Sequence, residues 1–298
     1  MKKFQKTTVL MVTILALVCF TLYGGEEKVV DKTFKALSNV KIKVVSGDCI
    51  FTKGGAGEIK VHLVYTFPDD RYKPIFKEEG DTLILEEEFS KDGCSSGKSK
   101  WTVTVPEQTA IDGKTASGDF SVAGIKGKIE CKVASGDIVI SEAKGEITAA
   151  SASGDISVKN SAGEMELKTA SGDIQVEKSE GAMELKCASG DIELTGVVFK
   201  GESEVKAVSG DVKIKLAGSL EYNLEISTVS GDVLLDYMGN PIKGHFSFSG
   251  QKENIKSSVP FDKKDESKYN PFMKAYFTKD GNSPEVSLKT VSGSLTLK

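Results

Sequence analysis

Apolar and polar residues alternate along most of this chain, and glycines interrupt the alternation at regular intervals. From Gly118 to Gly190 a glycine recurs every nine residues. An apolar side chain stands two residues after each of these glycines and another four residues after it, as Ile156 and Val158 follow Gly154. Period-two alternation indicates a strand with one buried face. Each nine-residue unit therefore predicts one short strand and one turn.

Two such units differ consistently, so the full repeat is eighteen residues long. Alternate glycines lie in Ser-Gly-Asp followed by an apolar residue, whereas the glycines between them precede Lys, Glu or Ala. One coil cannot bury its apolar face alone, but stacked coils share a continuous core. The repeat thus predicts an all-β fold, a β-solenoid or β-helix-like stack of about 18-residue coils with two short strands per coil. An antiparallel meander is the competing interpretation, and it does not explain the longer repeat.

Small residues mark the predicted corners of the coils. They stand seven residues after most of these glycines, as at Ala134, Ala143, Ser161 and Ala170. Small side chains suit a corner at which the chain turns and packs closely.

The regular repeat occupies only part of the chain. Residues 26–106 are rich in strand signals but irregular, and we expect an N-terminal cap region there. Residues 107–298 are the predicted solenoid, with an excursion at 251–284 that contains three prolines and a charged run. The repeat returns in the last strand as TVSGSLTL. That strand is expected to form an exposed edge or to be covered by the excursion.

Residues 1–25 have the pattern of a secretory signal peptide. Three lysines precede an uncharged run over residues 7–23, and Gly-Gly-Glu-Glu follows. Cleavage near Gly24 or Gly25 is the first interpretation. A lipid-modified Cys19 is the second, although no small residue precedes it, and an uncleaved anchor is the third. All three predict an exported protein in the periplasm, at the cell surface or secreted, and two of them attach it to the membrane.

The charge balance argues against one class of partner. The net charge is −4, and lysines and glutamates are interspersed on the predicted outer face. Nucleic-acid-binding domains carry a basic excess, so nucleic acid is not an expected partner.

The aspartates of the Ser-Gly-Asp motif should form a single column, with two interpretations. Carboxylates stacked about 4.8 Å apart repel each other, so a ladder of calcium ions is one way to compensate them. The other is that each aspartate follows glycine in a tight turn and hydrogen-bonds its own backbone. We favour the turn, because the calcium-roll motif with its additional glycines is absent. The residues concerned are Asp119, Asp137, Asp155, Asp173, Asp191, Asp211 and Asp232, with Asp48 at the start.

The residue pattern gives little support to a catalytic function. The stacked serines need a base in order to act as nucleophiles, and His62 and His245 both lie outside the regular coils. Parallel β-helices that cleave glycans carry clustered carboxylates on loops. The one acidic cluster with an arginine is Asp69, Asp70 and Arg71. We therefore expect a protein that is not an enzyme and that has no cofactor.

The five cysteines do not have the spacing of a zinc site. Cys131 and Cys187 are predicted to be buried thiols. Cys49 and Cys94 lie in the irregular region and could form a disulfide in an oxidising compartment.

Three passages resemble the bacterial "putative adhesin" family, also called Toastrack: KVVSGDCIF, WTVTVPEQTAIDGKTASGDFSV and EVSLKTVSGSLTL. The resemblance covers Val30 to Lys298. It implies an exported, all-β, solenoid-like domain of unknown function without established catalytic residues. This chain departs from the family pattern at Cys49, where an aliphatic residue is usual, and in the excursion before the last strand.

The leading hypothesis is therefore an exported, non-enzymatic β-strand-repeat protein, an adhesin-like binding or structural module of the cell envelope. Its partner would be an envelope protein or a polysaccharide, with membrane contact only through the N-terminus. One alternative is an envelope-stress sensor or regulator component tethered to the membrane. A glycan-active β-helix enzyme is the second alternative.

Overall fold

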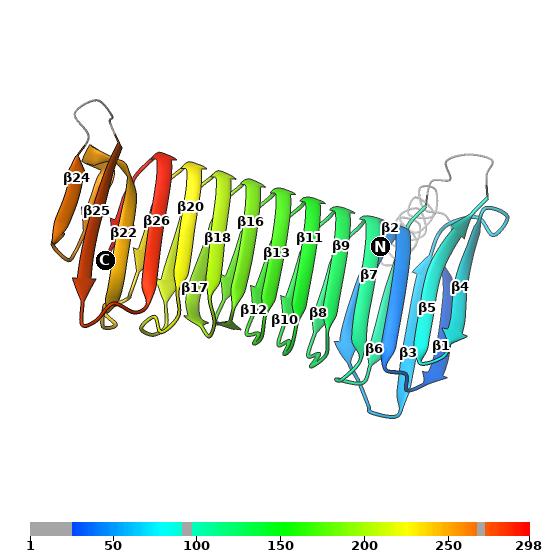
Figure 1. Ribbon diagram of the computed structural model, residues 1–298. Coiled ribbons are helices and arrows are strands. Elements are labelled where there is room, and N and C mark those ends of the chain that lie inside the picture. The colour runs from blue at the N-terminus through cyan, green and yellow to red at the C-terminus, as the bar shows by residue number, and fades with distance from the viewer. Residues whose placement is uncertain (1–25, 91–96, 267–271) are drawn as a thin grey trace, which may run out of the picture.

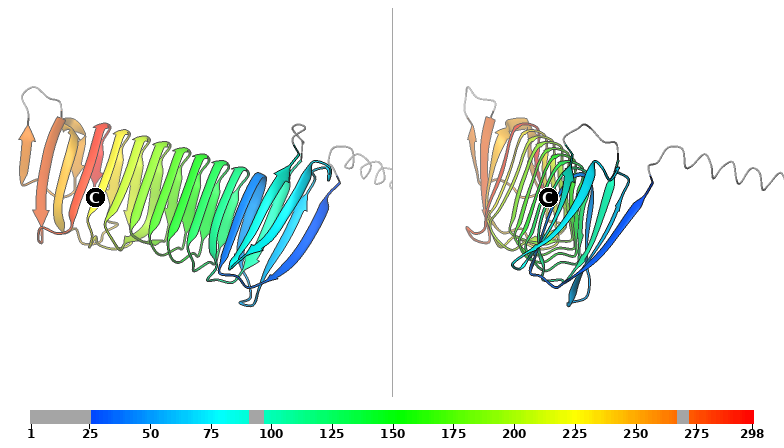
Figure 2. Two further views of the ribbon diagram at one scale, coloured as in Figure 1. Left: turned by 45° about the vertical axis from the view of Figure 1, so that its right-hand side comes forward. Right: turned by 90° about the vertical axis from the view of Figure 1, so that its right-hand side faces the viewer.

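The computed structural model describes residues 26–90, 97–266 and 272–298, and it shows an elongated β-solenoid (Figure 1). Two sheets, here called A and B, lie face to face, and each regular coil contributes one strand to each sheet (Figure 2). The space between the sheets is filled with apolar side chains such as Val158 and Leu167, both fully buried. The prediction of an all-β solenoid is confirmed.

Sheet B begins at the N-terminal end of the stack, and most of its strands are parallel. In spatial order its strands are β4 (Tyr72–Glu79), β5 (Thr82–Phe89), β2 (Asn39–Lys53), β7 (Ala110–Ser117), β9 (Ile129–Ser135), β11 (Ile147–Ser153), β13 (Met165–Ser171), β16 (Met183–Ser189), β18 (Ser203–Ser209), β20 (Leu224–Ser230), β26 (Glu285–Ser292), β22 (Gly244–Gln251), β25 (Phe272–Lys279) and β24 (Lys263–Glu266).

Sheet A follows the same axis, and β2 belongs to both sheets because it passes through the corner between them. Its spatial order is β1 (Lys28–Lys35), β3 (Glu58–Tyr65), β6 (Ser99–Val105), β2, β8 (Phe120–Ala123), β10 (Ile138–Ser141), β12 (Ile156–Lys159), β14 (Ile174–Glu177), β17 (Ile192–Phe199), β19 (Val212–Leu216), β21 (Val233–Asp236), β27 (Leu295–Leu297) and β23 (Ile255–Ser257). Two short elements complete the chain, β15 (Glu180–Gly181) beside β17, and the 3-10 turn η1 (Lys252–Asn254).

The strand register agrees with an eighteen-residue coil. Met165 lies beside Ile147 on one side and Met183 on the other, in parallel strands eighteen residues apart in sequence. An antiparallel meander would pair neighbouring units in opposite directions, so that alternative is excluded.

Both ends of the stack contain a strand inserted out of sequence order. At the N-terminal end, β2 lies between β5 and β7 in sheet B and between β6 and β8 in sheet A. At the C-terminal end, β26 and β27 lie between the β20–β21 coil and the β22–β23 coil. The last strand is therefore covered rather than exposed. Antiparallel strands β4, β1 and β3 extend one end, and β25 and β24 the other.

The corner glycines explain why coils stack so closely. Gly154 has φ +146°, and a Cβ atom there would lie 2.0 Å from the carbonyl oxygen of Gly136 in the preceding coil. Glycine is needed for both reasons, since it tolerates this φ and leaves room for the neighbouring backbone.

Candidate binding surface

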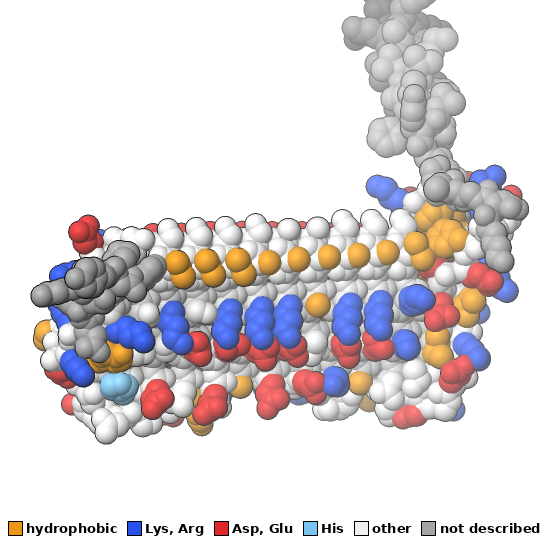
Figure 3. Space-filling model, turned by 45° about the horizontal axis from the view of Figure 1, so that its top comes forward, with side chains coloured by type: hydrophobic (Ala, Val, Ile, Leu, Met, Phe, Trp, Pro, Cys, Tyr) orange, Lys and Arg blue, Asp and Glu red, His pale blue; other side chains and the backbone are white. Residues whose placement is uncertain are grey.

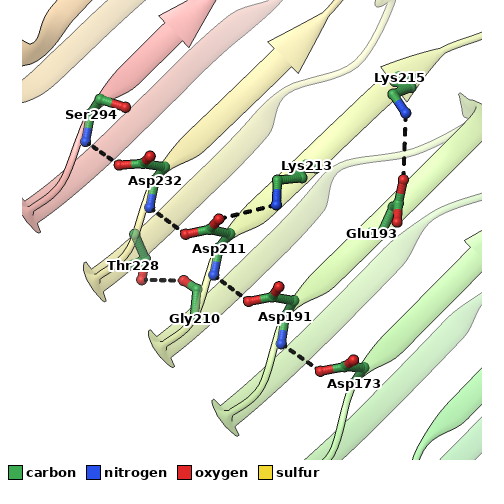
Figure 4. A network of polar contacts seen from close by, with 10 residues as sticks. All are labelled: Asp173, Asp191, Glu193, Gly210, Asp211, Lys213, Lys215, Thr228, Asp232 and Ser294. Carbon is green, nitrogen blue, oxygen red and sulfur yellow. Dashed lines mark hydrogen bonds and ion pairs between the residues drawn. The ribbon is translucent and has the colours of Figure 1, made fainter.

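The Ser-Gly-Asp corners form a hydrogen-bonded ladder along one margin of sheet B. The backbone N–H of Asp173 donates to Oδ1 of Asp155 in the preceding coil at 2.8 Å. The same contact repeats from Asp48 to Ser294, and Figure 4 shows its C-terminal part. The expectation that each aspartate would bond its own backbone is wrong. Its acceptor atom instead joins one coil to the next.

These hydrogen bonds also bear on the calcium hypothesis. Oδ1 of every aspartate proposed for the calcium ladder accepts a backbone N–H. Within residues 26–90, 97–266 and 272–298, no three His, Cys, Asp or Glu side chains are grouped so that they could hold a metal ion. The calcium ladder stays the less favoured alternative, and the hydrogen bonds give another reason for an aspartate at each corner.

The ladder carboxylates differ in whether a cation is paired with them. Asp211 is paired, with Oδ2 at 3.0 Å from Nζ of Lys213. The backbone N–H of Asp232 and then this ammonium hold the pKa of Asp211 below its usual range. Among the described residues, the other carboxylates of the ladder make no ion pair.

The outer face of sheet B presents three parallel rows of side chains (Figure 3). Alternation along each strand directs these residues to solvent, and the parallel register aligns them from coil to coil. We call them the glutamate row (Glu130, Glu166, Glu184, Glu204, Glu225), the lysine row (Lys114, Lys132, Lys168, Lys186, Lys206, Lys289) and the apolar row (Val45, Ala116, Ala134, Ala152, Ala170, Ala188, Val208, Val229, Val291).

Ion pairs connect the glutamate and lysine rows both within and between strands. Nζ of Lys186 lies 2.6 Å from Oε1 of Glu184 and 3.5 Å from Oε2 of Glu204. Lys168 pairs in the same way with Glu166 and Glu184. The Lys186 ammonium lowers the pKa of Glu184, and the carboxylate raises the pKa of Lys186. The rows therefore form a lattice of opposite charges.

The apolar row lies beside the lysine row and faces solvent. Val208, Val229 and Val291 are 55%, 50% and 51% exposed. The alanines of this row include Ala134 and Ala170, for which we expected close packing at a corner. They are exposed instead, whereas Ala143 and Ser161 at the opposite corner are buried as expected.

A groove of about 660 Å³ follows the other margin of the same face. It lies where the strands of sheet B begin, and its lining includes Glu146, Glu164, Glu202 and Glu285 together with the glutamate row from Glu166 onward. Glu146 is paired with Lys128 at 2.6 Å. The groove is consequently acidic.

The two histidines do not lie near the stacked serines of the Ser-Gly-Asp motif, which run from Ser117 to Ser230. His62 Nδ1 lies 2.7 Å from Oδ1 of Asp31, and His245 Nδ1 lies 3.1 Å from Oγ1 of Thr278. Both contacts are near the ends of the stack.

The cluster of Asp69, Asp70 and Arg71 near the N-terminal end makes its contacts with residues of that end. Asp69 pairs with Lys28 at 2.7 Å and accepts a hydrogen bond from the Tyr65 hydroxyl. Arg71 Nε lies 4.0 Å from Oδ2 of Asp70, with both side chains exposed.

Three cysteines are described, and all are buried and without a disulfide partner among the described residues: Cys49, Cys131 and Cys187. Burial raises the pKa of each thiol. Cys19 and Cys94 lie outside the described residues, as does the signal-peptide segment 1–25. Lipidation and the Cys49–Cys94 disulfide stay predictions.

The most densely bonded carboxylate described in the N-terminal region, Glu87, was not among the residues predicted to be functional. Its Oε1 accepts hydrogen bonds from the Tyr72 hydroxyl, the Ser99 hydroxyl and Trp101 Nε1. Its Oε2 accepts the backbone N–H of Val45 at 2.8 Å. The available signal was positional, because the alternation of β5 puts residue 87 on the inward side, where an acid is unusual.

The described residues contain no helix that is long and apolar enough to cross a membrane.

No curated protein matches the chain. Among solved structures, it is similar to a "putative adhesin" from Parabacteroides distasonis, with TM-score 0.54 and 11% identity over 92% of this chain and 98% of that one. A "putative lipid binding protein" from the same organism gives TM-score 0.53 and 15% identity over 92% and 97%. At these identities the likeness shows the fold alone.

The family assignment rests on the sequence itself. The Toastrack DUF4097 family model matches residues 37–260, which is well over half of the chain. That range contains the Ser-Gly-Asp corners from Asp48 to Asp232, and thus nearly all of the ladder. The chain belongs to the Toastrack family.

Proposed function

We propose that this protein is an adhesin-like, non-enzymatic binding module, and that the outer face of sheet B is its binding surface. The observation that carries the proposal is the alignment of the glutamate, lysine and apolar rows across β7 to β26. Such a face repeats the same chemical groups about every 4.8 Å along a rigid support. It can therefore contact an extended partner at many equivalent points.

An envelope protein fits this face better than a polysaccharide does. Sugar rings are commonly held against exposed aromatic rings, and Tyr222 is the one aromatic among the large hydrophobic side chains exposed in the described residues. Rows of opposite charge instead suit a protein surface of complementary charge, which they would align and select.

The names of the similar structures support a binding role. One neighbour is called an adhesin and another a lipid-binding protein. For this chain we prefer the first role, because the glutamates that line the groove would repel anionic lipid headgroups.

We place the protein outside the cytoplasm, at the cell envelope. The support is the signal-peptide pattern of residues 1–25. Cell fractionation with intact-mass measurement tests it. A mass that corresponds to cleavage near Gly24 indicates a free exported protein, and added acyl mass at Cys19 indicates a lipoprotein. A full-length chain in the cytoplasm would contradict export.

Binding is tested by capture from envelope extracts of the native host, with the purified protein as bait. Lys168→Glu/Lys186→Glu reverses two positions of the lysine row and should reduce capture of the partner. The matched control is Lys159→Glu/Lys215→Glu, which changes two exposed ion-paired lysines on the outer face of sheet A. Equal capture by both variants would contradict the proposed face. Capture of purified polysaccharide in place of protein would correct the partner class.

A further inference from the structure

The apolar row is the part of the proposed binding face whose contact with a partner has not yet been considered. It crosses nine neighbouring strands of sheet B, from β2 to β26. Three consecutive strands at its C-terminal end carry the half-exposed valines Val208, Val229 and Val291, and β2 carries Val45, which is 46% exposed. Valine at a solvent-facing position of three adjacent strands leaves apolar surface uncovered.

Opposite charges flank this row on its two sides. The lysine row stands two residues before it on each strand, as Lys168 precedes Ala170. On the other side, three residues later, stands the aspartate ladder, as Asp173 follows Ala170. Most of those aspartates have no ion pair among the described residues, and their Oδ2 atoms are unused. The surface is thus apolar along its middle, basic on one side and acidic on the other.

We propose that this margin of sheet B is the interface of a two-fold dimer of the chain, with the axis along the apolar row. A two-fold axis in that position puts each apolar row against the same row of the second copy, as an isologous interface requires. It also carries the lysine row of each copy across to the aspartate ladder of the other. At the Ser-Gly-Asp corner the surface of one copy curves away from the second copy. The long lysine side chains of the second copy would fill the gap that this leaves.

Charge selects this arrangement over the other two-fold packing of the same face. An axis along the strands would place lysine opposite lysine and aspartate opposite aspartate, and like charges in contact are unfavourable. The axis along the row instead keeps the two solenoids parallel. Because both copies have the same spacing between coils, every coil faces its equivalent along the whole length.

The contact area is sufficient for a stable dimer. Nine strands at about 4.8 Å span roughly 43 Å, and the width from the lysine row to the corner is about 15 Å, or four to five residues. Each copy would bury about 650 Å², so the total of about 1,300 Å² lies within the range of specific interfaces.

Sedimentation velocity over a concentration series of the full chain tests the proposal. Wild-type protein should show a concentration-dependent dimer. Val229→Asp puts a carboxylate on the axis and should weaken the dimer about 10-fold or more, because an unpaired charge is costly to bury. Val139→Asp is the matched control, since Val139 is 41% exposed on sheet A, and it should leave dimerisation unchanged. A protein that stays monomeric up to about 100 µM overturns the proposal.

Two further variants test the charges and the direction of packing. Asp155→Asn/Asp173→Asn keeps a side-chain oxygen for the ladder but removes the charge, so it should weaken the dimer without lowering the melting temperature. In a background with Cys94→Ser, Val229→Cys should be joined to its own equivalent by a short bismaleimide, and Val139→Cys should not. A dimer in which Val229→Cys gives no such cross-link would instead indicate another packing, such as antiparallel solenoids, and overturn the parallel dimer.

The dimer and the proposed function can fail separately. The dimer would cover the lysine row and leave the glutamate row and the groove open. A wild-type protein that is monomeric but still captures its partner therefore contradicts only the dimer. A dimer that captures nothing contradicts only the binding module.

Discussion

The Oδ1 atom of Asp155 accepts a hydrogen bond from the backbone N–H of Asp173, one coil further along the solenoid, at 2.8 Å. Its own N–H donates to Asp137 in the coil before. Each aspartate therefore connects three coils at a position where the strands have just ended and the chain turns. The carboxylate accepts a hydrogen bond from a backbone N–H that has no partner within the sheets.

Removing one acceptor of the ladder should weaken the stack locally. Asp155→Ala leaves the Asp173 N–H to water, and we expect it to lower the free energy of unfolding by about 1 kcal/mol. Asp155→Asn is the matched control, because its amide oxygen can accept the same hydrogen bond. Urea unfolding followed by circular dichroism measures both. An equal loss in the two variants would mean that the charge, not the hydrogen bond, is responsible.

The corner glycines should tolerate substitution far less than the aspartates do. Gly154→Ala adds a Cβ 2.0 Å from a backbone oxygen at a φ of +146°, so we expect a loss of about 3 kcal/mol or more. Gly55→Ala serves as the comparison, because a Cβ there meets nothing within 4 Å, and it should change stability by less than about 0.5 kcal/mol. Thermal unfolding of the two variants and the wild type measures the difference in melting temperature. Similar melting temperatures would show that the coils can separate to make room.

The regular coils could be predicted from the sequence because their signals are local. The glycine spacing sets the coil length, and the alternation identifies buried residues such as Ile156 and Val158. Stacked coils of identical length then leave one register in which every buried position meets its equivalent. For these coils, local spacing and tertiary packing agree.

The ends of the stack could not be predicted, because their pairing joins strands far apart in sequence. Ser294 donates its N–H to Asp232 across 62 residues, and the coil that covers this contact is made by the intervening chain. The motif VSG before Ser294 indicates that a corner forms there, but not which coil it joins. The exposure of Ala134 and Ala170 could not be predicted for a related reason. Spacing places Ala134 at a corner but does not show which side of the strand faces solvent next to the turn.

Acid should weaken the C-terminal part of the ladder. The pKa of Asp211 in the folded protein is lowered by the N–H of Asp232 and by Lys213. A depressed pKa contributes stability that is fully present above the unfolded value of 3.8 and is lost as the pH falls through the folded value. Asp211→Asn cannot titrate, so its deficit relative to wild type should be constant at neutral pH and shrink below about pH 4. Chemical unfolding at a series of pH values measures this difference, and a deficit unchanged down to about pH 2 would contradict the shift.

Glu87 should be the most sensitive single carboxylate of the N-terminal end. Glu87→Leu leaves the donors of Tyr72 and Trp101 without their acceptor inside the fold. The Ser99 hydroxyl, in contrast, can still donate to the Ser46 carbonyl. We expect a loss of about 3 kcal/mol or more, since unsatisfied buried donors are costly. Glu87→Gln retains one acceptor oxygen and should lose about half as much.

Trp101 is the only tryptophan of the sequence, and it is fully buried. Its fluorescence therefore reports unfolding of this end specifically, whereas circular dichroism reports the whole stack. For Glu87→Leu we expect the fluorescence transition to move to lower denaturant and to precede the circular dichroism transition, because coils of a solenoid depend mainly on their neighbours. If both signals instead change together at the wild-type midpoint, the hydrogen bonds of Glu87 do not hold this end in place.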